Sequence, residues 1–104
     1  MPGSGLMIIV RTLGLVTLLA VAACQTAPPV QEMSDARQAI MVAREAGAQD
    51  LAVADLQAAE AYLESAEQSL SARDYARARR DAIYAKDKAL EALKRIESSK
   101  DPGT

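Results

Sequence analysis

The feature that most limits the fold of this 104-residue chain is residues 34–98, a stretch rich in alanine and almost free of helix breakers. Eighteen of its 65 residues are alanine, and its only glycine or proline is Gly47. Alanine has the highest helix propensity, whereas glycine and proline have the lowest. The stretch is therefore predicted to be helical throughout, and the fold class to be all-α. The phase of the apolar positions then decides how many helices form.

A first change of phase falls near Gly47. The stripe before it consists of Ala36, Ile40, Ala43 and Gly47. The stripe after it is out of step with the first and consists of Leu56, Ala59, Leu63, Ala66 and Leu70. Gly47 can end a helix by taking a positive φ, and Asp50 can cap the next helix. We therefore predict helices over 34–46 and 51–71, with either a turn or a kink at Gly47.

A second change of phase follows Leu70. Continued straight, the stripe would place three arginines in the core, whereas a shifted frame gives a clean apolar stripe. The shifted stripe consists of Tyr75, Ala78, Ala82, Ala85, Ala89, Leu93 and Ile96. We predict that the chain folds back over 71–74 and that Asp74 caps a third helix over 74–98. Because 71–74 contains no glycine or proline, a single long bent helix that dimerises is the alternative.

The fold-back sets a register between the second and third helices. The opposing pairs would be Leu70 with Tyr75, Ala66 with Ala78, Leu63 with Ala82, and Leu56 with Ala89. Residues 32–67 carry a net charge of −6 and residues 73–101 a net charge of +3. An antiparallel pair would bring these faces together, with expected ion pairs between Glu67 and Arg77 and between Glu60 and Lys86. Exposed pairs of this kind favour a register more than they add stability.

Ile83 and Leu90 lie beside the third stripe and widen it. A wider stripe suits the helix over 34–46 packing alongside. The predicted body is thus a short antiparallel helical hairpin or three-helix bundle, followed by a disordered tail over 99–104.

The N-terminal part has the three regions of an export signal. Arg11 supplies a weak positive region, residues 13–22 form an uncharged run of ten, and the small residues Ala22 and Ala23 precede Cys24. A run of ten is about half of what a membrane-spanning helix needs. We predict a signal peptide over residues 1–23. Cys24 is the only cysteine, so the chain cannot form an internal disulfide.

The segment Val21-Ala22-Ala23-Cys24 resembles the lipobox of bacterial lipoproteins. The resemblance implies cleavage before Cys24 and a covalent lipid on that residue, with no other cofactor. Because Gln25 rather than aspartate follows, it also implies the periplasmic face of the outer membrane, in a Gram-negative host. The outer face of the inner membrane is the alternative location. An ordinary secreted protein with a chance cysteine is the alternative class.

A tether is expected between the lipid and the body, over residues 24–33. Pro28 and Pro29 forbid helix locally and favour extended geometry. The seven residues 25–31 would span roughly 20 Å in a polyproline conformation.

A second resemblance rests on a set of positions in the body. These are Ala46-Gly47-Ala48, Leu56, Ala59, Leu63, Ala66, Asp74-Tyr75, Ala78, Ala82, Ala85 and Ala89. Over about residues 34–97 the chain resembles the small helical lipoproteins catalogued as domain of unknown function 4398. Val53 stands where a proline often opens the second helix of that family, and Ala72-Arg73-Asp74 lacks the usual glycine. The family implies a helical lipoprotein and brings no established activity.

Residues 70–85 are also similar to part of a tetratricopeptide repeat, at Tyr75, Ala78 and Ala82. An array of such repeats needs about three copies of 34 residues to build a core. A tetratricopeptide-like peptide binder is therefore the less favoured interpretation.

The sequence holds no residue set typical of an active site or a metal site. Without histidine there is no Ser-His-Asp or Cys-His arrangement, and one cysteine cannot build a zinc site. Glu60, Glu64 and Glu67 follow one side of a helix, as a solvated face does. We therefore predict no catalytic residue, no metal and no enzymatic activity. The net charge of −2 also argues against a nucleic-acid partner.

The densest basic cluster lies at the predicted tip of the hairpin and consists of Arg73, Arg77, Arg79 and Arg80. A solvated turn that balances the acidic helix is the plain interpretation. The functional one is a contact for an anionic surface, such as peptidoglycan, lipid headgroups or an acidic protein face.

Two functions remain on these grounds. The favoured one is a membrane-anchored periplasmic lipoprotein that serves as an interaction or accessory module of the cell envelope, with an envelope protein or the cell wall as partner. The alternative is an oligomeric coiled-coil lipoprotein that links the membrane to the wall. The sequence leaves open whether the chain forms a homo-oligomer.

Overall fold

The computed structural model of the chain describes residues 27–100, which are almost entirely helical and contain no strand in that range. The helices are α2 (Val30–Glu45), α3 (Ala48–Leu51), α4 (Val53–Ser71) and α5 (Tyr75–Lys100). The predicted all-α class is confirmed. The predicted signal peptide, lipobox and lipid-bearing Cys24 lie outside the described residues, as do residues 101–104 of the predicted tail.

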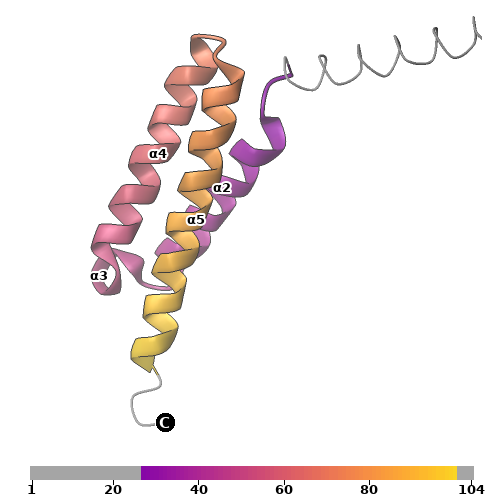
Figure 1. The fold of residues 1–104 in the computed structure, drawn as a ribbon. Coiled ribbons are helices and arrows are strands. Elements are labelled where there is room, and N and C mark those ends of the chain that lie inside the picture. The colour runs from indigo at the N-terminus through magenta and orange to yellow at the C-terminus, as the bar shows by residue number, and fades with distance from the viewer. Residues whose placement is uncertain (1–26, 101–104) are drawn as a thin grey trace, which may run out of the picture.

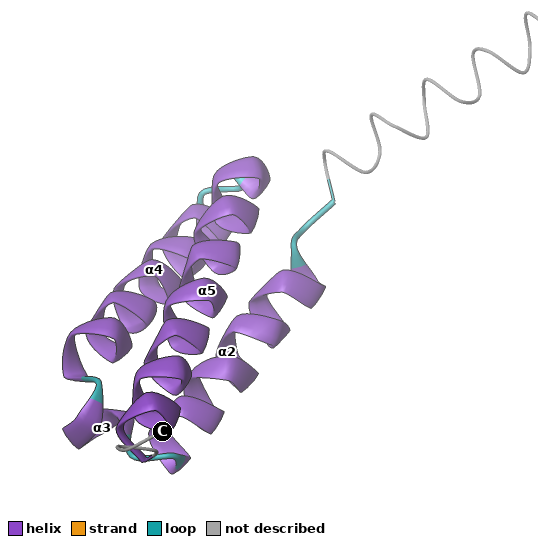
Figure 2. Cartoon of the chain, turned by 60° about the horizontal axis from the view of Figure 1, so that its bottom comes forward, coloured by secondary structure: helices purple, strands orange, loops and turns teal. Residues whose placement is uncertain are grey.

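The three long helices form a bundle in which α5 contacts both of the others extensively. Figure 1 shows α4 and α5 as an antiparallel hairpin, with α2 running beside them in the direction of α5. Figure 2 shows the same three helices from another side, with the short α3 closing the end opposite the α4–α5 turn. The predicted three-helix arrangement is therefore confirmed.

The core is built mainly from alanine. The buried apolar side chains are Met33, Ala36, Ile40, Ala43, Ala48, Ala52, Leu56, Ala59, Ala66, Ala78, Ala82, Ala85, Ala89, Ala92 and Ile96. Along α5, five of these are alanine and only Ile96 is larger. Side chains this small let helix surfaces approach closely. Most positions of the predicted apolar stripes are thus buried. Tyr75 is only partly buried, and Leu63, Leu70 and Leu93 pack against the core partly buried.

The first helix begins earlier than predicted, at Val30 instead of residue 34. Pro29 precedes it and is among the most buried side chains of the described chain, and Met33 is 1% exposed. Proline is tolerated at a helix start because the first amide groups need no partner within the helix. The predicted tether over 24–33 is therefore wrong for its last residues, which belong to α2 and are held on the bundle by the burial of Pro29 and Met33.

Gly47 makes a turn and not a kink. Its φ is 100°, and its N–H donates to the Arg44 carbonyl at 3.0 Å. The turn leads into the single-turn helix α3, after which the chain bends at Ala52. Asp50 lies inside α3, so its predicted role as the cap of the second long helix is wrong. That helix begins at Val53 instead of residue 51.

The predicted fold-back between α4 and α5 is confirmed. Arg73 takes a left-handed conformation, with φ at 62°. Its N–H donates to the Leu70 carbonyl at 3.0 Å, and the Asp74 N–H donates to the Ser69 carbonyl at 2.9 Å. This pair of bonds is the Schellman motif, which usually uses glycine where Arg73 stands. The alternative of one long bent helix is therefore wrong.

Asp74 caps α5 as predicted, since its Oδ1 accepts from the Arg77 N–H at 3.3 Å. The far end of α5 lies beyond the predicted boundary. The helix continues to Lys100, so residues 99 and 100 are helical and not part of a disordered tail.

The register between α4 and α5 agrees with the predicted pairs. The Ser65 Oγ donates to the Asp81 Oδ2 at 2.7 Å, and the rings of Tyr62 and Tyr84 lie 5.3 Å apart. Both contacts fall within about one residue of the expected pairing of Leu63 with Ala82.

The predicted ion pairs between α4 and α5 are wrong in their partners. Glu67 lies 3.5 Å from the Arg37 guanidinium, and Glu60 lies 2.6 Å from that of Arg44. Both arginines belong to α2. Because α2 packs along the acidic side of α4, its arginines pair with the α4 carboxylates in place of the basic residues of α5. The two pairs join α2 to α4 along their shared edge.

Candidate interaction surfaces

The start of the described chain is fastened to α5 by Arg79. One Nη of Arg79 donates to the Ala27 carbonyl at 3.0 Å, and its Nε lies 3.5 Å from the Glu32 carboxylate. Only 30% of the Arg79 side chain is exposed. Together with the burial of Pro29, these contacts hold the entrance to α2 against the second turn of α5. Arg79 therefore has a structural role in the bundle.

Arg80 belongs to a small network around Asp81. The Nε and Nη2 of Arg80 donate to the Asp81 Oδ1 at 3.1 and 3.0 Å, opposite the bond from Ser65. Asp81 is 3% exposed, covered by its neighbours on the flank of the bundle. Burial acts to raise the pKa of Asp81, but the bonds from Ser65 and Arg80 and the charges of Arg80 and Arg77 outweigh it and lower that pKa. The network thus holds an ionised carboxylate between α4 and α5.

Arg73 and Arg77 differ from the other two arginines of the predicted cluster. Both are exposed, and neither forms an ion pair with any residue in the range 27–100. Arg73 lies in the turn itself, and Arg77 borders a shallow polar hollow of about 270 Å³. The structure therefore divides the predicted cluster into two arginines with structural partners and two that point into solvent.

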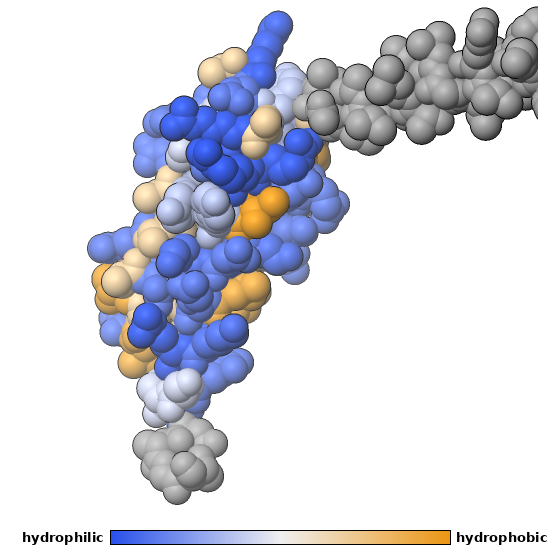
Figure 3. Space-filling view, viewed as in Figure 1, coloured by the Kyte–Doolittle hydropathy of each residue, from blue (hydrophilic) through white to orange (hydrophobic). Residues whose placement is uncertain are grey.

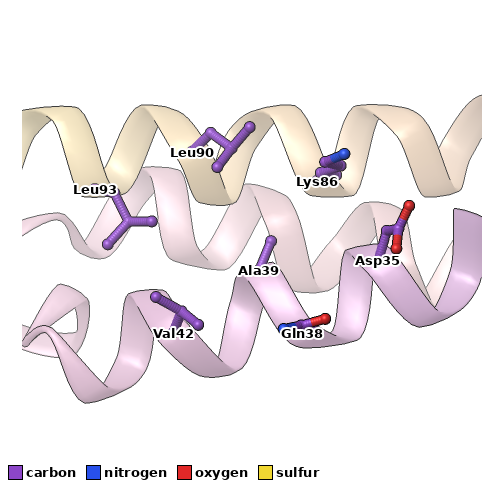
Figure 4. Close-up of a pocket in the computed structure, with 7 residues that line it drawn as sticks. All are labelled: Asp35, Gln38, Ala39, Val42, Lys86, Leu90 and Leu93. Atoms are coloured by element: carbon purple, nitrogen blue, oxygen red, sulfur yellow. The ribbon is translucent and has the colours of Figure 1, made fainter.

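A groove of about 290 Å³ runs between α2 and α5 (Figure 4). It is lined by Asp35, Gln38, Ala39 and Val42 from α2 and by Lys86, Leu90 and Leu93 from α5. Figure 4 shows Asp35 and Lys86 at one end, with Val42, Leu90 and Leu93 at the other. The groove therefore has a charged end and an apolar end.

The apolar end reaches the surface. Val42 is 41% exposed and Leu90 40%. Figure 3 shows apolar surface beside α5, interrupting the otherwise hydrophilic face. The first helix packs alongside α5 as predicted, and Leu90 lines the groove between them. Leu90 and Ile83 nevertheless stay 40% and 44% exposed.

This groove was not predicted from the sequence. A signal was present, since Ile83 and Leu90 are seven residues apart and lie off the main stripe of α5. Val42 is likewise off the buried stripe of α2. What the sequence could not provide was the position of α2 across α5, which brings Val42 next to Leu90 and leaves both in contact with solvent.

The described residues hold no group of three acidic or cysteine side chains placed to bind a metal ion. None of the helices between residues 27 and 100 is both long and apolar enough to cross a membrane.

The fold defines the chain as a small three-helix bundle with an alanine-rich core. Compared with protein families, curated proteins and solved structures, it matches none.

Proposed function

We propose that the protein is a lipid-anchored component of the bacterial cell envelope that acts through contacts of its helical body and catalyses no reaction. The observation that carries the proposal is the position of the only cysteine. Cys24 directly follows Val21-Ala22-Ala23 at the end of an apolar run. The resemblance to the lipobox and to the small helical lipoproteins of domain of unknown function 4398 supports the same conclusion.

A lipid on Cys24 is physically sufficient to hold the body at a membrane. Each buried methylene contributes about 0.8 kcal/mol, so a single acyl chain binds marginally and two or more give stable anchoring. Bacterial lipoproteins, whose lipobox the segment before Cys24 resembles, carry two or three acyl chains. The absence of aspartate at Gln25 supports the outer membrane, with the body in the periplasm, as the location.

The proposal is tested by expressing the full chain in a Gram-negative host and measuring the mass of the N-terminal fragment. We expect a fragment that begins at Cys24 and carries acyl chains, and a protein that fractionates with the outer membrane. Cys24→Ser should release the protein from the membrane fraction. An unmodified cysteine in a soluble periplasmic protein would refute the proposal.

A matched variant tests the location separately. Gln25→Asp preserves the lipobox but introduces the residue that commonly retains lipoproteins in the inner membrane. We expect the acylated variant to move from the outer to the inner membrane fraction. An acylated wild-type protein found already in the inner membrane would correct the location and leave the anchor in place.

An oligomeric structural lipoprotein that links membrane and wall is the second candidate. The observation that favours it is the apolar end of the groove, which a helix from a second copy of the chain would cover. The charged end offers one acidic and one basic side chain, Asp35 and Lys86, and a two-fold contact would present each with its opposite. Light scattering on the non-acylated protein distinguishes the two, since this candidate requires a dimer or larger species and Leu90→Glu should dissociate it.

A further inference from the structure

We infer that the α4–α5 turn, with Arg73 and Arg77, is a contact surface for the anionic phospholipid headgroups of the membrane that holds the Cys24 lipid. The inference rests on the proposed function, because it needs the lipid on Cys24. It adds a partner and an orientation for the body that the lipid alone does not determine.

The first step is the short distance between the lipid and the body. Only Gln25 and Thr26 separate Cys24 from Ala27. Three successive Cα steps of 3.8 Å cover at most about 11 Å. From Ala27 onward the chain is fixed, because Arg79 holds the Ala27 carbonyl and Pro29 is buried. The body is therefore held at the membrane surface, within about 11 Å of the lipid-bearing residue. A free tether over residues 25–31 would instead allow roughly 20 Å.

The second step is the orientation that this attachment imposes. The α4–α5 turn and the start of α2 lie at the same end of the bundle, whereas α3 and the C-terminal end of α5 lie at the other (Figure 1). Arg79 follows Asp74 by five residues, which corresponds to roughly 8 Å along the axis of α5. Along the axis of α5 the turn therefore lies roughly 8 Å past Arg79, which is about two-thirds of the 11 Å or so that residues 24–27 can span.

The third step is the charge at that end. Arg79 and Arg80 are engaged with Glu32 and Asp81, but Arg73 and Arg77 extend into solvent. The Asp74 carboxylate caps α5. Arginine forms paired hydrogen bonds to phosphate, and its attraction to an anionic surface acts over a Debye length of about 8 Å at physiological salt. An orientation in which the turn faces the membrane would bring both guanidinium groups within that range.

A single introduced cysteine can report the orientation, because acylation blocks the only native thiol. Ser71→Cys places a fluorophore at the turn, and Ser98→Cys places the same fluorophore at the far end of α5; both positions are exposed. The acylated full-length protein is reconstituted in vesicles of phosphatidylcholine with phosphatidylglycerol, and a nitroxide-headgroup phospholipid serves as quencher. We expect several-fold stronger quenching at residue 71 than at residue 98.

A charge variant then tests the arginines. Arg73→Asn with Arg77→Gln removes two charges at the turn, and asparagine tolerates the left-handed conformation of residue 73. Lys94→Gln with Lys100→Gln removes two charges near the far end as the matched control. We expect the first pair to lower quenching at residue 71 to the level measured in pure phosphatidylcholine vesicles, and the control pair to leave it unchanged. Circular dichroism verifies that both variants are folded.

The outcomes separate this inference from the proposed function. Acylated protein that floats with the vesicles but is quenched equally at both ends overturns the inference and leaves the lipid anchor intact. Equal quenching at residue 71 in neutral and anionic vesicles overturns the role of the arginines. A chain whose mass shows no acyl group overturns the proposed function and this inference together.

Discussion

Replacing Arg73 with glycine should stabilise the protein, although it removes a charged side chain and inserts the residue with the greatest backbone freedom. Arg73 has a φ of 62° in the turn between α4 and α5. A residue with a Cβ atom is roughly 1–2 kcal/mol less stable in this conformation than in the right-handed one. Arg73 forms no ion pair with residues 27–100, so its side chain contributes little that the substitution would remove.

The net effect is smaller than the conformational penalty, because glycine loses more entropy on folding. That loss is about 0.5–1 kcal/mol relative to alanine. The difference leaves Arg73→Gly more stable than the wild type by about 0.5–1 kcal/mol. For a domain of this size, such a gain raises the melting temperature by about 2–8 °C.

The assay is urea unfolding of the non-acylated protein that starts at Gln25, followed by far-ultraviolet circular dichroism. Arg73→Ala is the matched control, since it removes the same side chain but keeps the Cβ atom and its penalty. We expect Arg73→Ala to lie close to the wild type and Arg73→Gly to be more stable than both. If the glycine and alanine variants have the same stability, residue 73 is not held in the left-handed conformation.

Three further predictions use the same unfolding measurement. Gly47→Ala should destabilise the protein by about 0.5–1 kcal/mol through backbone strain alone, because the added Cβ would meet only a Leu51 side-chain atom at 3.6 Å; a neutral effect would contradict the positive φ. Asp81→Asn should destabilise it by about 1.5–3 kcal/mol near neutral pH, since it weakens hydrogen bonds to a charged group. Because the pKa of Asp81 is lowered in the folded protein, this stabilisation is present above the ordinary pKa of 3.8 and is lost as the pH falls through the folded-state pKa. The difference in unfolding free energy between Asp81→Asn and the wild type should therefore disappear in acid. A difference that does not depend on pH would speak against an ionised Asp81. Ala85→Leu should destabilise the bundle by about 1–3 kcal/mol because it overfills a fully buried contact, whereas Ala61→Leu on the exposed face of α4 should have little effect.

Much of the fold could be predicted from the sequence because the apolar pattern is strict. The alanines of α5 recur at helical spacing, and the shift of phase after Leu70 favoured a fold-back even without glycine. The left-handed conformation of Arg73 could not be predicted. Any residue can take this conformation when the packing of the helices on both sides of the turn outweighs its conformational cost. The position of α2 was also beyond the sequence pattern, since it depends on which side of the hairpin offers the closest fit for Met33 and Ile40.

The candidate surfaces were predicted less well than the fold. The arginine cluster was identified as four similar residues, but their separate roles follow from partners on other helices, such as Glu32 for Arg79. These partners depend on three-dimensional packing and leave no pattern along the chain. The groove between α2 and α5 was missed for the same reason, because each wall comes from a different helix.

The bond between Arg79 and the Ala27 carbonyl also determines where a mechanical load would enter the protein. A body attached to a surface through its first residues receives any drag or tension at that point. Without the bond, tension would peel α2 from its N-terminal end, one turn at a time. With it, and with Pro29 buried beneath, the load passes directly into α5, the helix that contacts both of its long neighbours. The bundle would then resist as a unit, and its first step of yielding would be the release of this single fastening point.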